Sequence, residues 1–193
     1  MKHLLLLFIY ILPIFALAQD NKIEKEDRIK LEEMPESVSL FLKENLPENI
    51  KKVRYYYETD GQKKSYEAKF KYERYNFSVE FNKDGNLEDV EITAKKNELI
   101  KLVYDNIEAH LEQNHERFRI EKIQAQYLSK DGDAKNTFYR SINFRKLQPD
   151  NYELIVATKD KGKLEKFEML FDEMGIFEEQ RKIIRNSYDY LLF

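Results

Sequence analysis

The sequence contains no cysteine, which excludes disulfide bonds, thiolate metal sites and thiol catalysis. It has only five glycines and no GxSxG, GxGxxG or P-loop motif, so little material is available for a loop that cradles phosphate. Only two histidines follow the first 18 residues, His110 and His115, and their spacing does not place both on one helix face for a shared metal. We therefore predict no catalytic residues, no metal site and no cofactor, and we expect a protein that is not an enzyme.

The charges show no strong excess of either sign. The chain carries 33 basic and 36 acidic residues, and the basic ones are spread along its length. A nucleic-acid-binding protein needs a clustered basic surface, so we expect no nucleic-acid partner. Tryptophan is absent, but 13 tyrosines and 13 phenylalanines are available to fill a core.

Residues 1–18 have the pattern of a secretory signal peptide. Lys2 is followed by an apolar run over residues 4–12 and by the small-residue pattern that ends at Ala18. The run is shorter than the roughly 20 residues of a transmembrane helix. We predict cleavage after Ala18, a periplasmic or secreted location, and no membrane insertion after cleavage. Residues 19–33 then form a charged leader.

Residues 75–92 have the pattern of a β-hairpin. Apolar residues alternate with polar ones from Tyr75 to Phe81, as in a strand with one buried face, and Asp84-Gly85 supplies a tight turn. A shift of 77 positions brings residues 152–169 into register, with six identities in eighteen positions. This match predicts that the chain contains two copies of one unit.

The rest of the chain can be assigned around these hairpins. We predict helices over residues 34–46 and 97–114, and strands over residues 51–59, 63–72, 118–129, 136–146, 152–158 and 164–171. The first unit is residues 34–95, the second is residues 96–172, and residues 173–193 are a tail expected to be helical. The predicted fold class is α+β, with two tandem repeats that each pack a helix on one face of a four-stranded antiparallel sheet.

The segments KENLPENI, VRYYYETDG, YEAKFKY, NFSVEF and NKDGNLEDVEI resemble the PepSY-like family of exported bacterial domains. That family is similar in fold to β-lactamase inhibitory protein. The resemblance covers residues 34–92 well and the second half less closely. It implies tandem helix-and-sheet units, no catalytic residues, and a role in binding or inhibiting another protein.

The open face of the predicted sheet is the candidate binding surface. Tyrosine and arginine set among polar residues are typical of protein interfaces, although a solvated sheet face has a similar composition. We expect an unknown envelope or secreted protein to dock there. The alternative is a small-ligand carrier with an aromatic cavity between helices and sheet, lined by Tyr55, Tyr57, Tyr66 and Tyr75. The predicted partner-binding residues are Arg54, Tyr56, Lys69, Lys71, Tyr139, Asn143 and Arg145.

Overall fold

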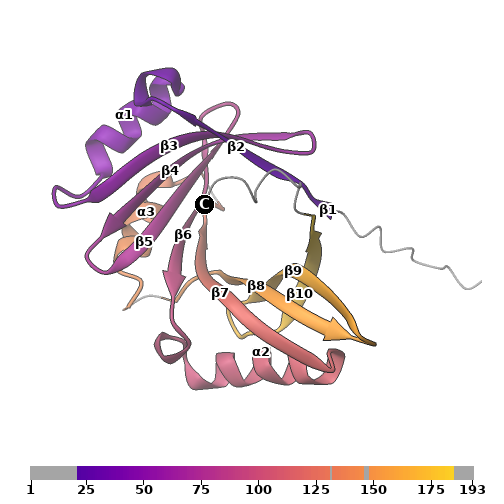
Figure 1. Cartoon of the computed structure of the whole chain (residues 1–193). Helices are drawn as coiled ribbons and strands as arrows, with labels where there is room; N and C mark the ends of the chain where they lie inside the picture. The colour runs from indigo at the N-terminus through magenta and orange to yellow at the C-terminus, as the bar shows by residue number, and fades with distance from the viewer. Residues whose placement is uncertain (1–20, 131, 146–147, 185–193) are drawn as a thin grey trace, which may run out of the picture.

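The computed structural model describes residues 21–130, 132–145 and 148–184 (Figure 1). Its helices are α1 (Glu36–Asn45), α2 (Lys101–Asn114) and α3 (Ala134–Ile142). Its strands are β1 (Asn21–Lys22), β2 (Glu24–Ile29), β3 (Lys51–Asp60), β4 (Lys63–Tyr72), β5 (Tyr75–Asn82), β6 (Leu87–Ala94), β7 (Arg117–Leu128), β8 (Asn151–Asp160), β9 (Lys163–Asp172) and β10 (Phe177–Ile183).

The described strands form one sheet, in the spatial order β1-β10-β9-β8-β7-β6-β5-β4-β3-β2. From β2 to β10 each strand pairs antiparallel with the next along the chain, whereas β1 pairs parallel with β10. Because only Ile23 separates β1 from β2, the N-terminal segment lies on both edges of the sheet. The sheet is therefore strongly curved and nearly closed on itself, and the helices lie outside the curve (Figure 1).

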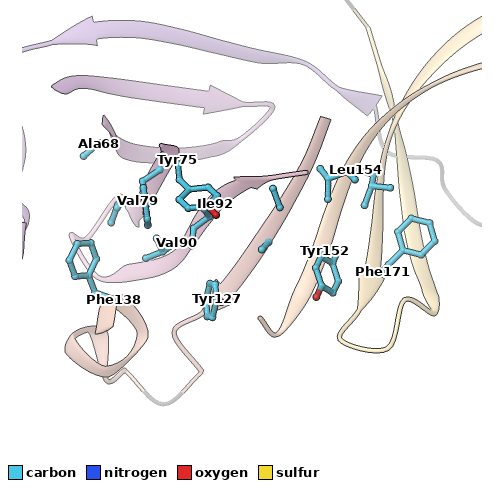
Figure 2. Packing of buried hydrophobic residues seen from close by; sticks show 14 of the residues in the cluster. Ala68, Tyr75, Val79, Val90, Ile92, Tyr127, Phe138, Tyr152, Leu154 and Phe171 are labelled. Atoms are coloured by element: carbon cyan, nitrogen blue, oxygen red, sulfur yellow. The ribbon is translucent and has the colours of Figure 1, made fainter. Parts of the chain in front are cut away.

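The core lies between the helices and the outer face of the sheet. The alternation predicted for β5 is observed, because Phe77, Val79 and Phe81 are buried there. Phe41 of α1 packs edge-on against Phe81 at 5.6 Å and against Phe138 of α3 at 5.9 Å between ring centroids. Figure 2 shows Val79 and Phe138 among the buried side chains of this cluster. Helices and sheet therefore share one apolar layer.

The predicted hairpin turn is confirmed. Gly85 has a φ of +81°, and a Cβ placed on it would lie 2.4 Å from Ser37 Oγ at the start of α1. The positive φ favours glycine here, and a side chain would in addition force Ser37 to move. The helices predicted over residues 34–46 and 97–114 also form, although α2 begins at Lys101.

The predicted fold class is wrong. The described strands do not form two separate four-stranded sheets, because β6 pairs with β7 and joins both halves into one sheet. An isolated four-stranded unit would leave unpaired N–H and C=O groups on an edge strand, and pairing between the halves satisfies them. The sheet is also larger than predicted because β1, β2 and β10 extend it.

The strand predicted over residues 136–146 is also wrong. The structure has helix α3 there, with Thr137, Phe138 and Ser141 buried on one side. Asp133 caps its start, since the Asn136 N–H donates to Asp133 Oδ1 at 3.0 Å. Burial at positions i, i+1 and i+4 follows a helical period, which the alternating interpretation overlooked.

The tail does not form the predicted helix where it is described, because residues 177–183 form strand β10. The turn before it explains the reversal. The Asp172 side chain accepts from the backbone N–H groups of Met174 (2.9 Å) and Ile176 (2.8 Å), and Gly175 has a φ of +79°. The chain then returns along β9 and pairs with it, which satisfies the backbone groups of that strand.

This turn also corrects the predicted repeat register. Asn82 Oδ1 accepts from the N–H groups of Asp84 and Asn86, which is the pattern that Asp172 makes 90 residues later. The β8–β9 turn at Gly162 shows no such side-chain cap among the described contacts. The local counterpart of Gly85 is therefore Gly175 and not Gly162, so the 77-position match joined two hairpins that are not equivalent.

The predicted signal peptide, residues 1–18, lies outside the described residues. The charged leader is described from Asn21 onward and contributes β1 and β2 to the sheet. No helix in the described part of the chain combines the length and the apolar character needed to cross a membrane.

Candidate binding cleft

Alternation along the strands gives the sheet an apolar outer face and a polar inner face. On β6, Val90 and Ile92 are fully buried in the core. Asp89 and Glu91 therefore point to the inside of the curve, and Glu153 does the same on β8. The polar face is thus a direct consequence of the strand period.

The inside of the curve holds a cleft with a volume of about 940 Å³. Among the described residues, eleven carboxylate and six cationic side chains line it, which is an excess of five negative charges when all are ionised. The carboxylates are Glu24, Glu26, Glu58, Asp60, Glu67, Glu80, Asp89, Glu91, Glu153, Glu168 and Glu179, and the cations are Lys22, Lys25, Lys63, Lys69, Lys122 and Arg181.

Most of the carboxylates on the walls of the cleft are neutralised by the chain's own cations. Burial alone would lower the pKa of Lys22, but the carboxylates of Glu168, Glu153 and Glu24 outweigh it and raise that pKa. The pairs are Lys22 with Glu24 and Glu168, Lys63 with Glu80 and Glu88, Lys69 with Glu26 and Glu67, and Arg181 with Asp60 and Glu168.

Three carboxylates in the middle of the sheet, Asp89, Glu91 and Glu153, have no ion pair with any described cation, and we call them the floor carboxylates. Asp89 is 8% exposed, and its Oδ2 accepts from Gln126 Nε2 at 3.0 Å. Its Oδ1 is buried without a hydrogen-bond partner. Glu91 accepts from Gln124, and Glu153 forms no hydrogen bond with another described residue. The floor therefore has unused acceptor capacity.

The environment of the floor carboxylates favours their protonated forms. Burial, followed by repulsion from Glu168, raises the pKa of Glu153 to about 7. Burial also raises the pKa of Asp89 and of Glu91 well above the ordinary range, and Glu153 repels both. Protons are thus held in the cleft near neutral pH, where free carboxylates would be ionised.

A second acidic group lies at the β2–β3 edge. Carboxylate oxygens of Glu24, Glu26 and Glu58 come within 4.8 Å of one another, close enough in principle to share a metal ion. Lys22 and Lys69 already pair with Glu24 and Glu26, however, which leaves Glu58 as the unneutralised member. Burial, followed by repulsion from Glu24, raises the pKa of Glu58 to about 9. The group is neutralised by lysine and by a proton, and we assign no metal to it.

The N-terminal segment closes one side of the cleft. The Ile23 N–H donates to Asp60 Oδ1 at 3.0 Å, and Asp60 also pairs with Arg181 of β10. Lys22 pairs with Glu168 of β9 from the same side. Through these contacts the segment around Ile23 holds β3, near one edge of the sheet, against β9 and β10, near the other edge.

A smaller hollow of about 320 Å³ adjoins the cleft and has the opposite charge. Its lining includes Lys52, Arg54, Lys69, Lys71 and Lys122, and Glu91 is the one carboxylate among its described lining residues. Lys69, Lys122 and Glu91 also line the larger cleft, so the two hollows are continuous. The polar face therefore combines an acidic cleft with a basic margin.

The structure divides the predicted partner-binding residues between two sides of the sheet. Arg54 and Tyr56 of β3 and Lys69 and Lys71 of β4 lie on the inner face, where Lys69 lies over the Tyr56 ring at 5.2 Å. The other three lie on α3 or beyond it. Tyr139 is 64% exposed, Asn143 donates to the Tyr139 carbonyl at 2.9 Å, and Arg145 Nε donates to Tyr75 Oη at 2.9 Å.

The residues are divided because residues 134–142 form helix α3 and not part of the strand predicted over residues 136–146. In a strand those three side chains would extend the inner face, whereas α3 packs on the outer face. They therefore do not form one surface with Arg54 and Tyr56. The floor carboxylates were not among the predicted site residues, although the alternation in LEDVEI and NYELIV already places their side chains opposite the core.

No family model matches the chain, and no curated protein matches it. Solved structures do resemble it. A DUF2874 family protein from Bacteroides ovatus aligns with a TM-score of 0.51 and 17% identity, over 81% of this chain and 92% of that chain. A protein from Bacteroides eggerthii, provisionally described as periplasmic, aligns with a TM-score of 0.51 and 16% identity, over 81% and 94%. A BLIP-like protein from Bacteroides fragilis aligns with a TM-score of 0.49 and 14% identity, over 79% and 89%.

At 16% and 17% identity the first two structures show a shared fold and nothing about function. The chain thus has a fold similar to that of a DUF2874 family protein. Membership of the PepSY-like family, which the sequence led us to expect, is not shown, because no family model matches the chain.

Proposed function

We propose that this chain is an exported, non-enzymatic binding protein and that a partner protein docks in the cleft on the inner face of its sheet. The observation that supports the proposal is the cleft itself, about 940 Å³ in volume and lined by charged groups on all ten described strands. Burying carboxylates without ion pairs costs free energy, whether they stay ionised or take up a proton to avoid the buried charge, so folding alone gives no reason for them. A function that uses those carboxylates accounts for them.

The proposed location is the periplasm or the outside of the cell, and it rests on the signal-peptide pattern of residues 1–18. The proposed partner is an envelope or secreted protein. Inhibition of an envelope or secreted enzyme is the narrower form of the same proposal, since a protein that binds an enzyme through such a cleft can block it.

The carrier alternative has less support. It needs an aromatic cavity between helices and sheet, but the two cavities described above both lie on the polar face. Tyr57 and Tyr66, two of the proposed lining residues, pack on each other at 5.4 Å between ring centroids. Tyr75 packs against Phe144 at 4.6 Å. These rings fill space on the core side of the sheet.

The test is affinity capture with a cleft that is filled without a change of charge. Ile155 lines the cleft and makes no polar side-chain contact, so Ile155→Trp would occupy the space that a partner needs. Leu40 is 55% exposed on α1, outside the curve, and Leu40→Trp is the matched control. We expect the mature chain and the control to capture the same partner from envelope extract, and the Ile155→Trp variant to lose it.

The captured partner is then purified and titrated against each chain by calorimetry. Circular dichroism and a thermal melt establish that the Ile155→Trp variant is folded. Retention of full affinity by a folded Ile155→Trp chain would contradict the proposed docking site.

A further inference from the structure

We infer that the partner inserts a basic side chain, carried on a polypeptide segment, between the floor carboxylates Asp89, Glu91 and Glu153. This inference rests on the proposed function and names the chemistry of the partner. The acidic composition of the cleft is only its starting point. The stronger observation concerns Asp89, which lines the cleft and is only 8% exposed. Its Oδ2 accepts from Gln126, but its buried Oδ1 has no hydrogen-bond partner.

The chain's own cations do not satisfy the floor. Lys22, Lys63 and Lys69 are each held by two other carboxylates. Lys122 is exposed and lines both hollows, yet it forms no ion pair with a described carboxylate. The floor therefore offers an external cation three carboxylates that form no ion pair with a described cation of the chain.

The spacing of the floor carboxylates fits an extended cation better than a metal ion. Asp89 and Glu91 lie on β6, and Glu153 lies two strands away on β8, level with Thr93 of β6. At the backbone, Glu153 is therefore roughly 12 Å from Glu91 and roughly 17 Å from Asp89. Among the described residues, one acidic group is compact enough to hold a metal ion, and it consists of Glu24, Glu26 and Glu58. None of the floor carboxylates belongs to that group. A guanidinium carries five N–H donors in a fixed plane and can bridge separate carboxylates, including a bidentate contact.

The size of the cleft and its basic margin favour a polypeptide over a small polyamine. At about 30 Å³ per molecule, its volume corresponds to roughly thirty waters, which is far more than one cation needs. The adjoining hollow with Lys52, Arg54 and Lys71 would repel a polyamine that extended into it. A polypeptide can present a basic residue to the floor and an acidic residue to this margin at the same time.

Binding should release protons. The pKa of Glu153 lies at about 7, and a cation beside it favours the charged form. Other charged groups also act on this pKa: the carboxylates of Glu168 and Glu24 raise it, and the ammonium groups of Lys22 and Lys122 lower it. We expect affinity for a basic segment to rise between about pH 6 and about pH 8, with proton release visible in buffers of different ionisation enthalpy.

The test uses the mature chain and a fluorescein-labelled peptide, Arg-Gly-Arg-Gly-Glu-Gly-Glu, whose zero net side-chain charge removes non-specific attraction. The same peptide with glutamate in place of arginine, spermine alone and calcium alone are the comparison probes. The triple variant Asp89→Asn, Glu91→Gln, Glu153→Gln removes the floor charges while keeping the side-chain shapes. Glu48→Gln, Glu112→Gln, Glu173→Gln is the matched control, because these three carboxylates are exposed and lie outside both hollows.

We expect the arginine peptide to bind the native chain, and the triple variant to bind it about ten-fold more weakly. The control variant should change its affinity by less than about two-fold. Equal binding of the arginine and glutamate peptides, or no binding of either, would overturn the inference. The inference would also be overturned if the native chain bound spermine or calcium but did not bind the arginine peptide.

These results are distinct from the test of the proposed function. A chain that captures a partner through the cleft but does not bind the arginine peptide contradicts only the inference about basic side chains. A chain whose capture is insensitive to Ile155→Trp contradicts the docking site itself.

Discussion

The residues with the most unusual environments are the carboxylates of the cleft. Glu58 and Glu153 have pKa values of about 9 and about 7, against an ordinary value of 4.5, because both are buried among other carboxylates. Between the unfolded and the folded pKa, the folded chain holds a proton that the unfolded chain has lost. Stability must therefore fall as the pH rises through this interval.

The first prediction follows from that sign. We expect the thermal midpoint to fall between about pH 5 and about pH 9, with the Glu153 contribution complete near pH 7 and that of Glu58 near pH 9. Glu58→Gln and Glu153→Gln should each flatten this dependence and stabilise the chain at about pH 8 by on the order of 1 kcal/mol. Thermal melts across the pH range measure it, with Glu48→Gln as the exposed control. The prediction would be contradicted if the thermal midpoints of the native chain and of the Glu58→Gln, Glu153→Gln and Glu48→Gln variants changed with pH in parallel.

Among the structural elements, the turns decide how the helices meet the sheet. Gly162 and Gly175 have nearly the same positive φ, +80° and +79°. Only Gly175 lies against a helix, because a Cβ there would come within 2.4 Å of the Val103 carbonyl oxygen in α2. A Cβ on Gly162 would meet no atom within 4 Å. The two glycines therefore separate backbone strain from steric clash.

The second prediction uses this pair. Gly162→Ala should cost about 1 kcal/mol, which is the expense of a left-handed conformation for alanine. Gly175→Ala should cost more, about 2 kcal/mol or above, because the turn must also move away from α2. Urea unfolding of the two variants measures the difference. Equal free-energy losses would show that the β9–β10 turn can relax freely from the helix.

At the scale of the whole molecule, one contact set joins the two ends of the sheet. Asp60 accepts from the Ile23 backbone and pairs with Arg181, so β3, the β1–β2 segment and β10 meet at one side chain. Strand edges left unpaired are prone to opening, and this contact protects both edges at once.

The third prediction is that Asp60→Ala opens this closure without unfolding the molecule. We expect faster amide hydrogen exchange in β1 and β10 and unchanged exchange in β5, β6 and β7. The loss of overall stability should be about 1 to 3 kcal/mol, because a charged acceptor with two partners is removed. Asp27→Ala, at an exposed carboxylate of β2, is the control. Native-state exchange followed by mass spectrometry distinguishes the outcomes, and unchanged exchange in β10 would contradict the role assigned to Asp60.

Much of the local structure could be predicted from the residues alone. The alternation from Tyr75 to Phe81 and the Asp84-Gly85 turn predicted β5, β6 and their turn, because strand period and turn chemistry act over short distances. Helix α3 was missed because Phe138 and Ile142 fit a strand as well as a helix. In the folded chain the Asp133 cap and packing against Phe41 favour the helix.

The sequence by itself determined which side chains face away from the core, since residues on one strand alternate whatever their surroundings. It therefore already contained the acidic inner face, including Asp89, Glu91 and Glu153. Only the tertiary structure decided that this face is curved into one cleft, because β6 pairs with β7 across the intervening helix α2 and β1 pairs with β10 near the other end of the described chain. Such pairing depends on which edges remain unpaired after the hairpins form, and no local pattern encodes it.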